Sequence, residues 1–430
     1  MVYTPPPGPI NLLNGNKTIA PWTVFAIIAP VYFFSMFHRI APSILVPELA
    51  ADLNVPIPSL DILGGATFIT YGLMQLPAGL LTDALGGRKA LCLICIANCI
   101  GVTCFALSTT LAEATASRAL IGIGCSTFVP GIALLAYYFH PRVFARVNGY
   151  FTALGAMGSV LAGTPLAIAS TMFGWRTCML VCASIMAALG LIVWTFLKEN
   201  TSRPAETHAT KTDKHPGLFQ GLGMVLKTKT FWPPCIWFAC TSGLYFAFGG
   251  LWWGAFLREG CNLSKEDAGQ IMSVAFICVI VGQPIMAMLA ERLGGRRRLI
   301  QAGTFLGLIA MLVMAMAKGT LPFAAHFVLG ILFTLAGVTF AVLIFGALRT
   351  TFPAHMVGRA AGCMQTLPYL FAVPIIQKLF GGVLEWRLEV HGNNALLAYA
   401  DAMYVNVAVL AIALVVSFFI DDPKSDETTD

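Results

Sequence analysis

Two adjacent basic residues, His38 and Arg39, lie well inside the first long apolar run of the sequence. A guanidinium is costly at such a position unless it faces water, a partner or a substrate. Its planar fork of donors suits carboxylate, phosphate or sulfonate groups, and an imidazole beside it can carry a proton. These residues predict anion binding by Arg39 and, as a hypothesis, proton transfer by His38. The alternatives are that Arg39 pairs with a carboxylate or with carbonyl groups freed by Pro42, and that His38 is a hydrogen-bonded structural group.

Composition indicates which elements hold these side chains. The chain has 430 residues, is 57% hydrophobic and 11% charged, and has a mean hydropathy of +0.79, which excludes a water-soluble globular protein. Its charges separate apolar runs of roughly 20 to 28 residues, each long enough to cross a bilayer as a helix. We predict an all-α integral membrane protein with twelve transmembrane helices in two pseudo-symmetric six-helix bundles. The expected helices are 22–48, 59–82, 89–109, 112–137, 146–170, 176–197, 231–257, 267–290, 299–317, 321–350, 357–383 and 396–420.

Lysine and arginine are distributed unequally between alternate connections. Cytoplasmic loops collect these residues, so we expect a multi-pass protein of the cell inner (plasma) membrane with both termini in the cytoplasm. The expected divisions are a tail (1–21), a six-helix bundle (22–197), a cytoplasmic linker (198–230), a second bundle (231–420) and a tail (421–430). The acidic residues nearest the spans all fall at or beyond the outer helix ends. They are Glu48, Asp52, Asp61 and Glu113.

A charged, glycine-rich loop occurs twice. The carboxylate, Gly-Gly pair and basic cluster of residues 79–89 return in residues 289–298. Residues 139–149 and 352–362 form a second matched pair of loops at nearly the same offset, each with an arginine followed three positions later by glycine. Repeats of this kind are typical of secondary transporters built from two related halves.

The first of these loops resembles the signature loop between the second and third helices of the major facilitator superfamily. The residues that carry this resemblance are Gly79, Asp83, Gly86, Arg88 and Lys89. Arg118-Ala-Leu-Ile-Gly-Ile-Gly124 is similar to the family's second motif, residues 155–165 are a loose version of its third, and residues 173–176 match a turn often found before the sixth helix. The resemblance covers nearly the whole chain except the linker and the tails. An extra glycine, Gly87, departs from the signature, and the repeat shares it.

The resemblance implies a conformational switch at the cytoplasmic face. Asp83 would meet the positive N-terminal end of the eleventh helix near Arg359, and by symmetry Glu291 would meet the start of the fifth helix near Arg146. Contacts that form only when this face is closed would bias an equilibrium between two states. The alternative is that these charges only fix the topology at the membrane surface.

Around Arg39 the sequence resembles the organic-anion and organophosphate (anion:cation symporter-like) branches, in which an arginine here holds the anionic group in a central cavity. The resemblance also implies that Arg118 interacts with the first helix and, with His38, helps to couple protons. Tyr245 and Gln365 are the other predicted substrate contacts, against the alternatives of packing, an interfacial position or contact between helices. Phosphate-ester antiporters take a second arginine from the seventh helix, and the matching stretch here has no basic residue. We therefore expect a singly charged or mixed substrate.

No nucleotide-binding loop, metal-ligand spacing or nucleophile–base set is present in the sequence, so we expect neither a cofactor nor an enzyme. We predict a secondary active transporter that moves a small organic anion by proton symport or exchange through alternating access. The alternatives are proton-driven efflux of an amphipathic compound, which the loose third motif favours, and, ranked lower, a transporter-like membrane sensor. The expected partners are the anionic small molecule, protons and the lipid bilayer, with no nucleic acid, and the chain is expected to be a monomer.

Overall fold

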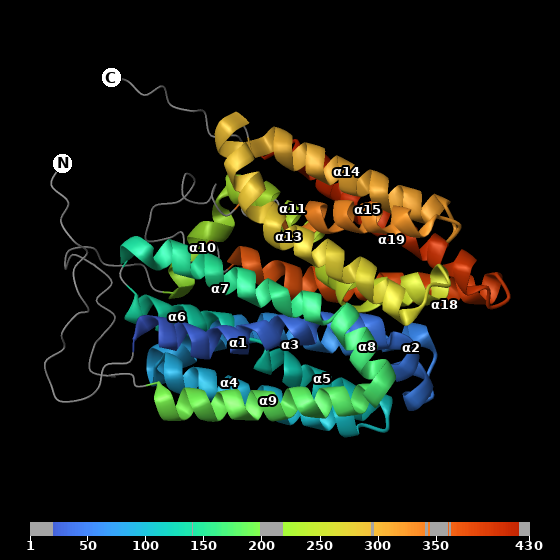
Figure 1. Ribbon diagram of the computed structural model, residues 1–430. Coiled ribbons are helices and arrows are strands. Elements are labelled where there is room, and N and C mark those ends of the chain that lie inside the picture. Colours follow the sequence, from blue (N-terminus) through green and yellow to red (C-terminus); the bar gives the residue numbers. More distant parts are fainter. Residues whose placement is uncertain are drawn as a thin grey trace, which may run out of the picture.

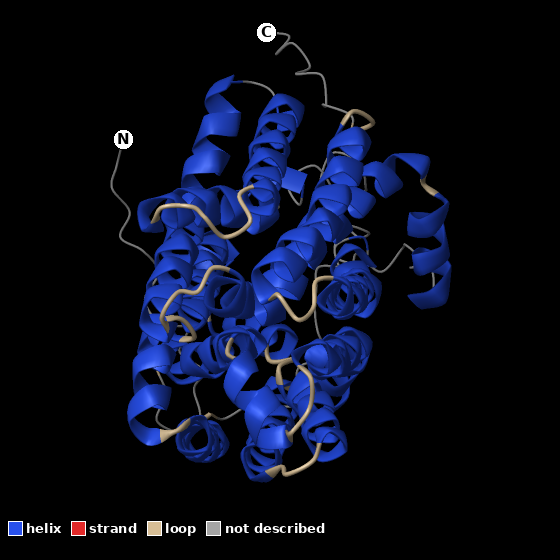
Figure 2. Cartoon of the chain, turned by 90° about the vertical axis from the view of Figure 1, so that its right-hand side faces the viewer, coloured by secondary structure: helices blue, strands red, loops and turns tan. Residues whose placement is uncertain are grey.

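The computed structural model describes residues 20–139, 141–197, 218–293, 296–339, 343–344, 360 and 363–420. Within these ranges the chain is helical and contains no strand (Figure 2). The elements of the first half are α1 (Pro21–Ile40), α2 (Pro42–Leu53), η1 (Ile57–Leu60), α3 (Asp61–Leu85), α4 (Gly87–Leu107), α5 (Leu111–Gly124), α6 (Phe128–Tyr138), α7 (Pro141–Leu161), α8 (Thr164–Phe173) and α9 (Trp175–Phe196).

The second half is helical in the same way. Its elements are α10 (Leu218–Lys227), η2 (Lys229–Phe231), α11 (Trp232–Ala247), η3 (Phe248–Trp252), α12 (Trp253–Ala255), η4 (Phe256–Gly260), α13 (Lys265–Leu293), α14 (Arg296–Met316), α15 (Phe323–Thr334), η5 (Leu335–Thr339), η6 (Pro368–Ala372), α18 (Val373–Val390) and α19 (Ala395–Ser417).

The described elements form twelve successive passages, six in each half, and this confirms the predicted fold class. By length and composition, nine described helical stretches suffice to cross a membrane, and the bent pair α7–α8 makes a tenth. The remaining two passages are α13 and the shorter apolar helix that α15 and η5 form together. Side chains such as Leu73, Ile96 and Val281 are exposed, as expected for surfaces that face lipid.

Three helices that the sequence predicts as continuous are interrupted in the first half, which corrects the expected ranges. The helix expected over 22–48 breaks at Ala41, because Pro42 has no N–H to donate. The next break separates α5 from α6 at residues 125–127. The third lies between α7 and α8, which bend by 43° around Gly163, whose ψ of −115° is not helical. These breaks expose backbone groups inside the molecule.

In the second half the passages widen into π turns instead. They are η3 and η4 in the seventh passage, η5 in the tenth and η6 in the eleventh. η6 begins at Pro368, which cannot donate a helical hydrogen bond. Single π turns inside helices are frequent at functional sites, because they re-aim the side chains that they carry.

Close packing within each half depends on small residues. In the first half α4 lies against α5 and α9, and α1 against α7; in the second half α14 lies against α19. A Cβ atom at Gly158 of α7 would come within 2.0 Å of the Phe33 carbonyl oxygen on α1. One at Gly124 would come within 2.4 Å of the Asn98 Cα. Glycine therefore sets the distance between these helices.

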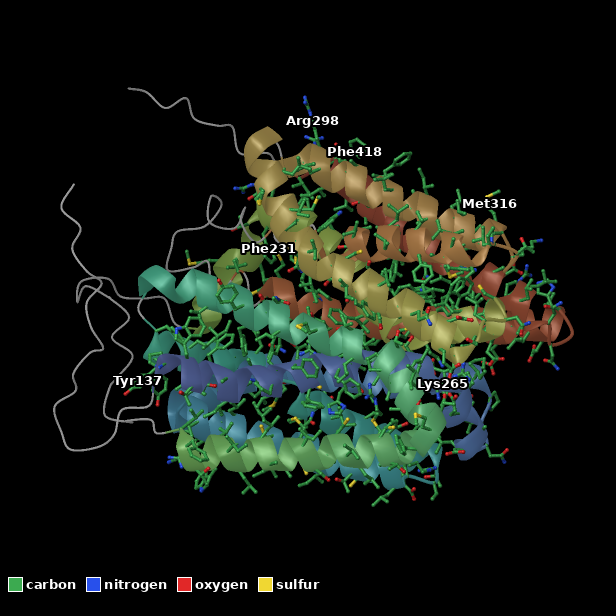
Figure 3. The ribbon with its side chains drawn as sticks, in the orientation of Figure 1. Tyr137, Phe231, Lys265, Arg298, Met316 and Phe418 are labelled. Atoms are coloured by element: carbon green, nitrogen blue, oxygen red, sulfur yellow. The ribbon has the colours of Figure 1, made fainter. Side chains whose placement is uncertain are left out.

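The two halves meet at one end of the molecule and diverge toward the other (Figure 1). Where they meet, α13 lies against α7 and α8, α18 against α3, and α12 against α2. Figure 3 places Lys265 at this end, where α13 begins, and Arg298 at the opposite end, near the start of α14. We call the first the Glu48 end, because Glu48 pairs there with Arg258 and Lys265, and the second the Arg298 end.

The linker predicted over 198–230 contains one described helix. Leu218–Lys227 form the helix α10, where the sequence gives no sustained apolar pattern, and Lys229–Phe231 form the turn η2. The Trp232 indole donates a hydrogen bond to the Leu226 carbonyl oxygen at 2.9 Å, which holds α10 to the start of α11. Residues 198–217 lie outside the described ranges.

Candidate functional site

Arg39 is the penultimate residue of α1, two positions before the break at Ala41, and is only 1% exposed. Its Nη2 donates to the Ser35 Oγ and to the Cys125 carbonyl oxygen, each at 3.1 Å. The second acceptor is available because the helix is interrupted between α5 and α6. Its Nε and Nη1 are buried without a hydrogen-bond partner, and no carboxylate pairs with it among the residues that the structure describes. A buried positive charge thus keeps free donors for an anion.

Aromatic rings surround this guanidinium. The Arg39 Cζ lies 3.8 Å from the centroid of the Tyr71 ring on α3 and 5.9 Å from that of the Tyr369 ring in η6. The two tyrosine rings meet edge to face at 4.8 Å, and Phe68 and Phe246 both lie against Tyr369. We call Phe68, Tyr71, Phe246 and Tyr369 the aromatic cluster. It presents π faces from both halves of the molecule to one cation.

A second buried guanidinium, Arg118, approaches the residue next to Arg39. Arg118 is 2% exposed, and its Nη1 donates to the His38 carbonyl oxygen at 3.0 Å, which joins α5 to α1. Its Nε has no partner, and neither has the His38 Nε2. The Thr67 hydroxyl of α3 holds the Arg118 carbonyl oxygen at 3.0 Å and so fixes the backbone that carries this arginine. His38 of α1 therefore lies beside two guanidinium groups, that of its neighbour Arg39 and that of Arg118.

The other two predicted contacts lie in the second half. Tyr245 is buried at 5% exposure, and its ring meets that of Phe246 edge to face at 4.9 Å, beside the aromatic cluster. Gln365 is partly exposed and lies four residues before Tyr369, in the helical segment that leads into η6. The structure brings Arg39, His38 and Arg118 together and places Tyr245 next to the cluster.

Two residues that face Arg39 were missed by the sequence analysis. Tyr71 and Tyr369 are single aromatic residues in apolar helices, where packing is the ordinary expectation. A signal was present in each case. Phe68 and Tyr71 are spaced to share a helix face, and Tyr369 follows Pro368, which disturbs the helix at that point.

The predicted switch residues are described only in part. Gly86 joins α3 to α4 with φ at +86°, a conformation that favours glycine. Arg88 donates to the Trp194 carbonyl oxygen and lies over the Trp194 ring, with the Cζ 4.7 Å from its centroid. Gly79 lies within α3, and Lys89 is exposed at the start of α4. The side chains of Asp83, Glu291 and Arg146, and all of Arg359, lie outside the described residues, so the expected pairs stay predictions.

Ion pairs join the two halves at the Glu48 end. Glu48 of α2 pairs with Arg258 at 2.6 Å and with Lys265 at 3.0 Å, and Asp61 of α3 pairs with Lys378 of α18 at 3.1 Å. Burial favours the neutral form of Glu48, but its hydrogen bonds and attraction to Arg258 and Lys265 outweigh burial and hold the pKa of Glu48 below its ordinary value. The carboxylate of Glu48 is thus kept ionised between two cations.

Two serine hydroxyls also bind backbone groups of the opposite half. The Ser43 Oγ of α2 accepts a hydrogen bond from the Gly254 N–H at 2.8 Å. The Ser273 Oγ of α13 accepts from the Thr164 N–H at 2.8 Å and donates to the Val160 carbonyl oxygen at 3.0 Å. Ser273 thereby gives the Thr164 N–H, at the start of α8, an acceptor across the interface, and it adds a second donor to the Val160 carbonyl oxygen, which also accepts from the Gly163 N–H at 3.1 Å. These contacts and the ion pairs close the Glu48 end.

Comparison with known proteins gives a consistent picture. Residues 28–388 match the sequence profile of the Major Facilitator Superfamily. The chain is 24% identical over 298 residues to a putative tartrate transporter of Agrobacterium vitis, an alignment that covers 64% of this chain and 67% of that protein. It is 20% identical to a probable sulfoacetate transporter of Cupriavidus necator, over 80% of this chain and 83% of that protein. A crystal structure of a bacterial homologue of the human lysosomal transporter Spinster has the same fold, with a TM-score of 0.76 at 15% identity and coverage of 94% and 98%.

Proposed function

Because the chain belongs to the Major Facilitator Superfamily, whose members are transporters and not enzymes, we propose that it moves a small organic anion across the membrane by alternating access. Arg39 is the group that binds the anion. The observation that carries this proposal is a guanidinium at 1% exposure with two unpartnered nitrogens and no paired carboxylate among the described residues. Tartrate and sulfoacetate, the substrates in the names of two relatives, are both anions.

The arrangement of the two halves supports alternating access. The halves are joined at the Glu48 end and diverge toward the Arg298 end (Figure 1), and Arg39 contacts aromatic rings from both halves. An anion approaches from the Arg298 end, toward which the halves diverge in this state, and leaves toward the Glu48 end after the ion pairs and serine contacts have parted. The distribution of lysine and arginine favours a cytoplasmic Arg298 end in a bacterial inner membrane. Closure there by Asp83 and Glu291 is part of this proposal.

Proton coupling, as symport or exchange, uses the charges beside the anion. Arg39 and Arg118 place two positive charges near His38, and a proton on its imidazole would add a third. A bound anion offsets part of that charge and makes the added proton less costly. Anion and proton binding then favour each other, as coupling requires.

Export of an amphipathic compound is the second candidate. The aromatic cluster favours it, because it supplies buried apolar surface from Phe68 and Phe246 beside the charge. The direction of movement separates the two candidates. In oriented vesicles, an imposed proton gradient moves the substrate of an anion importer and the substrate of an exporter of amphipathic compounds to opposite sides of the membrane.

Uptake by proteoliposomes tests the proposal. Radiolabelled organic acids are supplied with and without a pH gradient to the wild type and to the variants Arg39→Ala and Arg39→Lys. Removing a guanidinium from a buried anion contact weakens binding by at least about 30-fold, whereas lysine keeps the charge and part of the uptake. Arg298→Ala is the matched control, because Arg298 is exposed far from the site. Full uptake in Arg39→Ala would refute the assignment.

A further inference from the structure

We propose that the substrate is a monoanion with a flat apolar body, such as an aromatic monocarboxylate, and that Tyr71 and Tyr369 select it. This inference rests on the proposed function, because it assigns the chemistry of the anion that Arg39 binds. It names the substrate class and two specificity-determining residues.

The first support is the position of the rings relative to the charge. Tyr71 lies directly against the guanidinium, with its ring centroid 3.8 Å from the Arg39 Cζ. Tyr369 meets Tyr71 at an interplanar angle of 87° and lies 5.9 Å from the same Cζ. An anion bound to the free Nε or Nη1 of Arg39 therefore has aromatic surface beside it. A carboxylate attached directly to a ring matches this arrangement of charge and π surface.

The second support is that the tyrosine pair crosses between the two halves. Tyr71 belongs to α3 in the first half, and Tyr369 belongs to η6 in the second. Their edge-to-face contact must open when the halves move relative to each other. A flat ring inserted between them takes over the contacts that each tyrosine loses. The free nitrogens of Arg39 are fully buried in the present state, so parting of this pair also gives the anion access to them.

Two phenylalanine rings pack against Tyr369 of this pair. Phe68 stacks on Tyr369 with an interplanar angle of 9° at 6.2 Å, and Phe246 lies 5.3 Å from Tyr369 and 5.6 Å from Phe68. All four rings of the aromatic cluster are at most 5% exposed. A polyhydroxylated acid would lose hydrogen bonds to water against these rings, at a cost that an aromatic acid does not meet.

Arg39 is the cation that the structure places over the rings of the aromatic cluster, whereas the second buried guanidinium, that of Arg118, lies near Phe105 and donates to the His38 carbonyl oxygen. A second carboxylate on the same ligand would lie against rings instead of a cation. We therefore expect monoanions to bind more tightly than dianions.

Wild-type protein in lipid nanodiscs provides the first test, by isothermal titration with benzoate, cyclohexanecarboxylate, acetate, galactonate and tartrate. We expect benzoate to bind more than about tenfold tighter than acetate, because its ring becomes buried, and tighter than galactonate or tartrate. Tighter binding of galactonate or tartrate that disappears in Arg39→Ala overturns this inference and leaves the proposed function intact. If none of the acids binds in a manner that depends on Arg39, the proposed function itself is wrong.

Variants then test the tyrosines. Tyr71→Leu and Tyr369→Leu should weaken benzoate binding about 2- to 12-fold, the usual contribution of an aromatic pair, and leave acetate binding unchanged. Tyr71→Phe keeps the ring and should keep benzoate binding, which shows that the protein still folds. Tyr404→Leu is the matched control, because Tyr404 is 47% exposed on α19. Equal loss of benzoate and acetate binding in Tyr71→Leu, or no loss of either, contradicts selection by the rings.

Discussion

Replacing Ser273 by alanine should loosen the Glu48 end. The Ser273 hydroxyl of α13 makes two hydrogen bonds to the first half, with the Thr164 N–H and the Val160 carbonyl oxygen. It is 7% exposed, so its removal leaves the Thr164 N–H without a partner, and the Val160 carbonyl oxygen with only the Gly163 N–H, in a site that water reaches poorly. In the opposite state of the transporter, with the Glu48 end open, water satisfies these groups in the wild type and the variant alike. The substitution therefore destabilises the closed state selectively.

The magnitude follows from the two hydrogen bonds. At about 0.5 to 1.5 kcal/mol net for each bond, the closed state loses about 1 to 3 kcal/mol. This corresponds to a roughly 5- to 150-fold change in the ratio of closed to open molecules. The change is large enough to detect even if the wild type is almost entirely closed.

Hydrogen–deuterium exchange with mass spectrometry measures this change, because the Thr164 amide is itself one of the donors. We expect faster exchange in peptides that contain Thr164 and, across the same end, in peptides around Gly254, whose N–H donates to Ser43. Ser170→Ala is the matched control. Ser170 is similarly buried, but it bonds only to carbonyl oxygens of its own helix, α8. Unchanged exchange in Ser273→Ala, or equal acceleration in Ser170→Ala, would refute a closing contact at Ser273.

Three further predictions concern other contacts. Glu48→Gln should accelerate hydrogen–deuterium exchange at the Glu48 end, because it removes the carboxylate that Arg258 and Lys265 share. It should also increase chemical labelling of side chains that line this end when it opens. Unchanged exchange and labelling would contradict this role of Glu48. The pKa of Glu48 is held below its ordinary value of 4.5, so its ionised carboxylate stabilises the closed state fully at pH values above 4.5. This stabilisation is lost as the pH falls through the lower pKa of Glu48 in the folded protein. Exchange should therefore accelerate, relative to the intrinsic rate, on acidification below about pH 4.5 in the wild type and much less in Glu48→Gln. Gly86→Ala should lower the free energy of unfolding by about 1 to 3 kcal/mol, because φ of +86° with ψ of 155° is a conformation almost restricted to glycine. Gly79→Ala should not, because Gly79 lies inside α3 with no atom near its Cβ. Equal melting temperatures of the two variants in differential scanning fluorimetry would contradict this.

The sequence predicts the passages and the depth of Arg39 well, because both depend on local composition. Apolar runs of sufficient length become helices in a bilayer wherever they occur, and an arginine inside such a run is buried wherever the run lies within a bundle. The breaks at Ala41 and Gly163 were missed for the same reason. Apolar residues continue through both, and proline or glycine within a membrane helix does not by itself mark an interruption.

The rest of the site depends on contacts between segments far apart in the chain. Tyr71 and Tyr369 become neighbours only through the packing of α3 against η6. Ser273 accepts from the Thr164 N–H, which lacks a helical partner because the helix breaks between α7 and α8. No local pattern in the sequence shows which distant residues will be in contact. Arg118 differs, because it belongs to a recognisable motif, and it lies next to α1 as the resemblance implies.

Equilibrium binding of benzoate and acetate to the wild type, Arg39→Ala and Arg39→Lys tests most directly whether Arg39 binds the transported anion. If Arg39 binds the anion, binding of both acids weakens by at least about 30-fold in Arg39→Ala and only partly in Arg39→Lys, while Arg298→Ala binds as the wild type does. Undiminished binding of the acids to Arg39→Ala, in protein that retains its thermal stability, would show that Arg39 does not bind the anion.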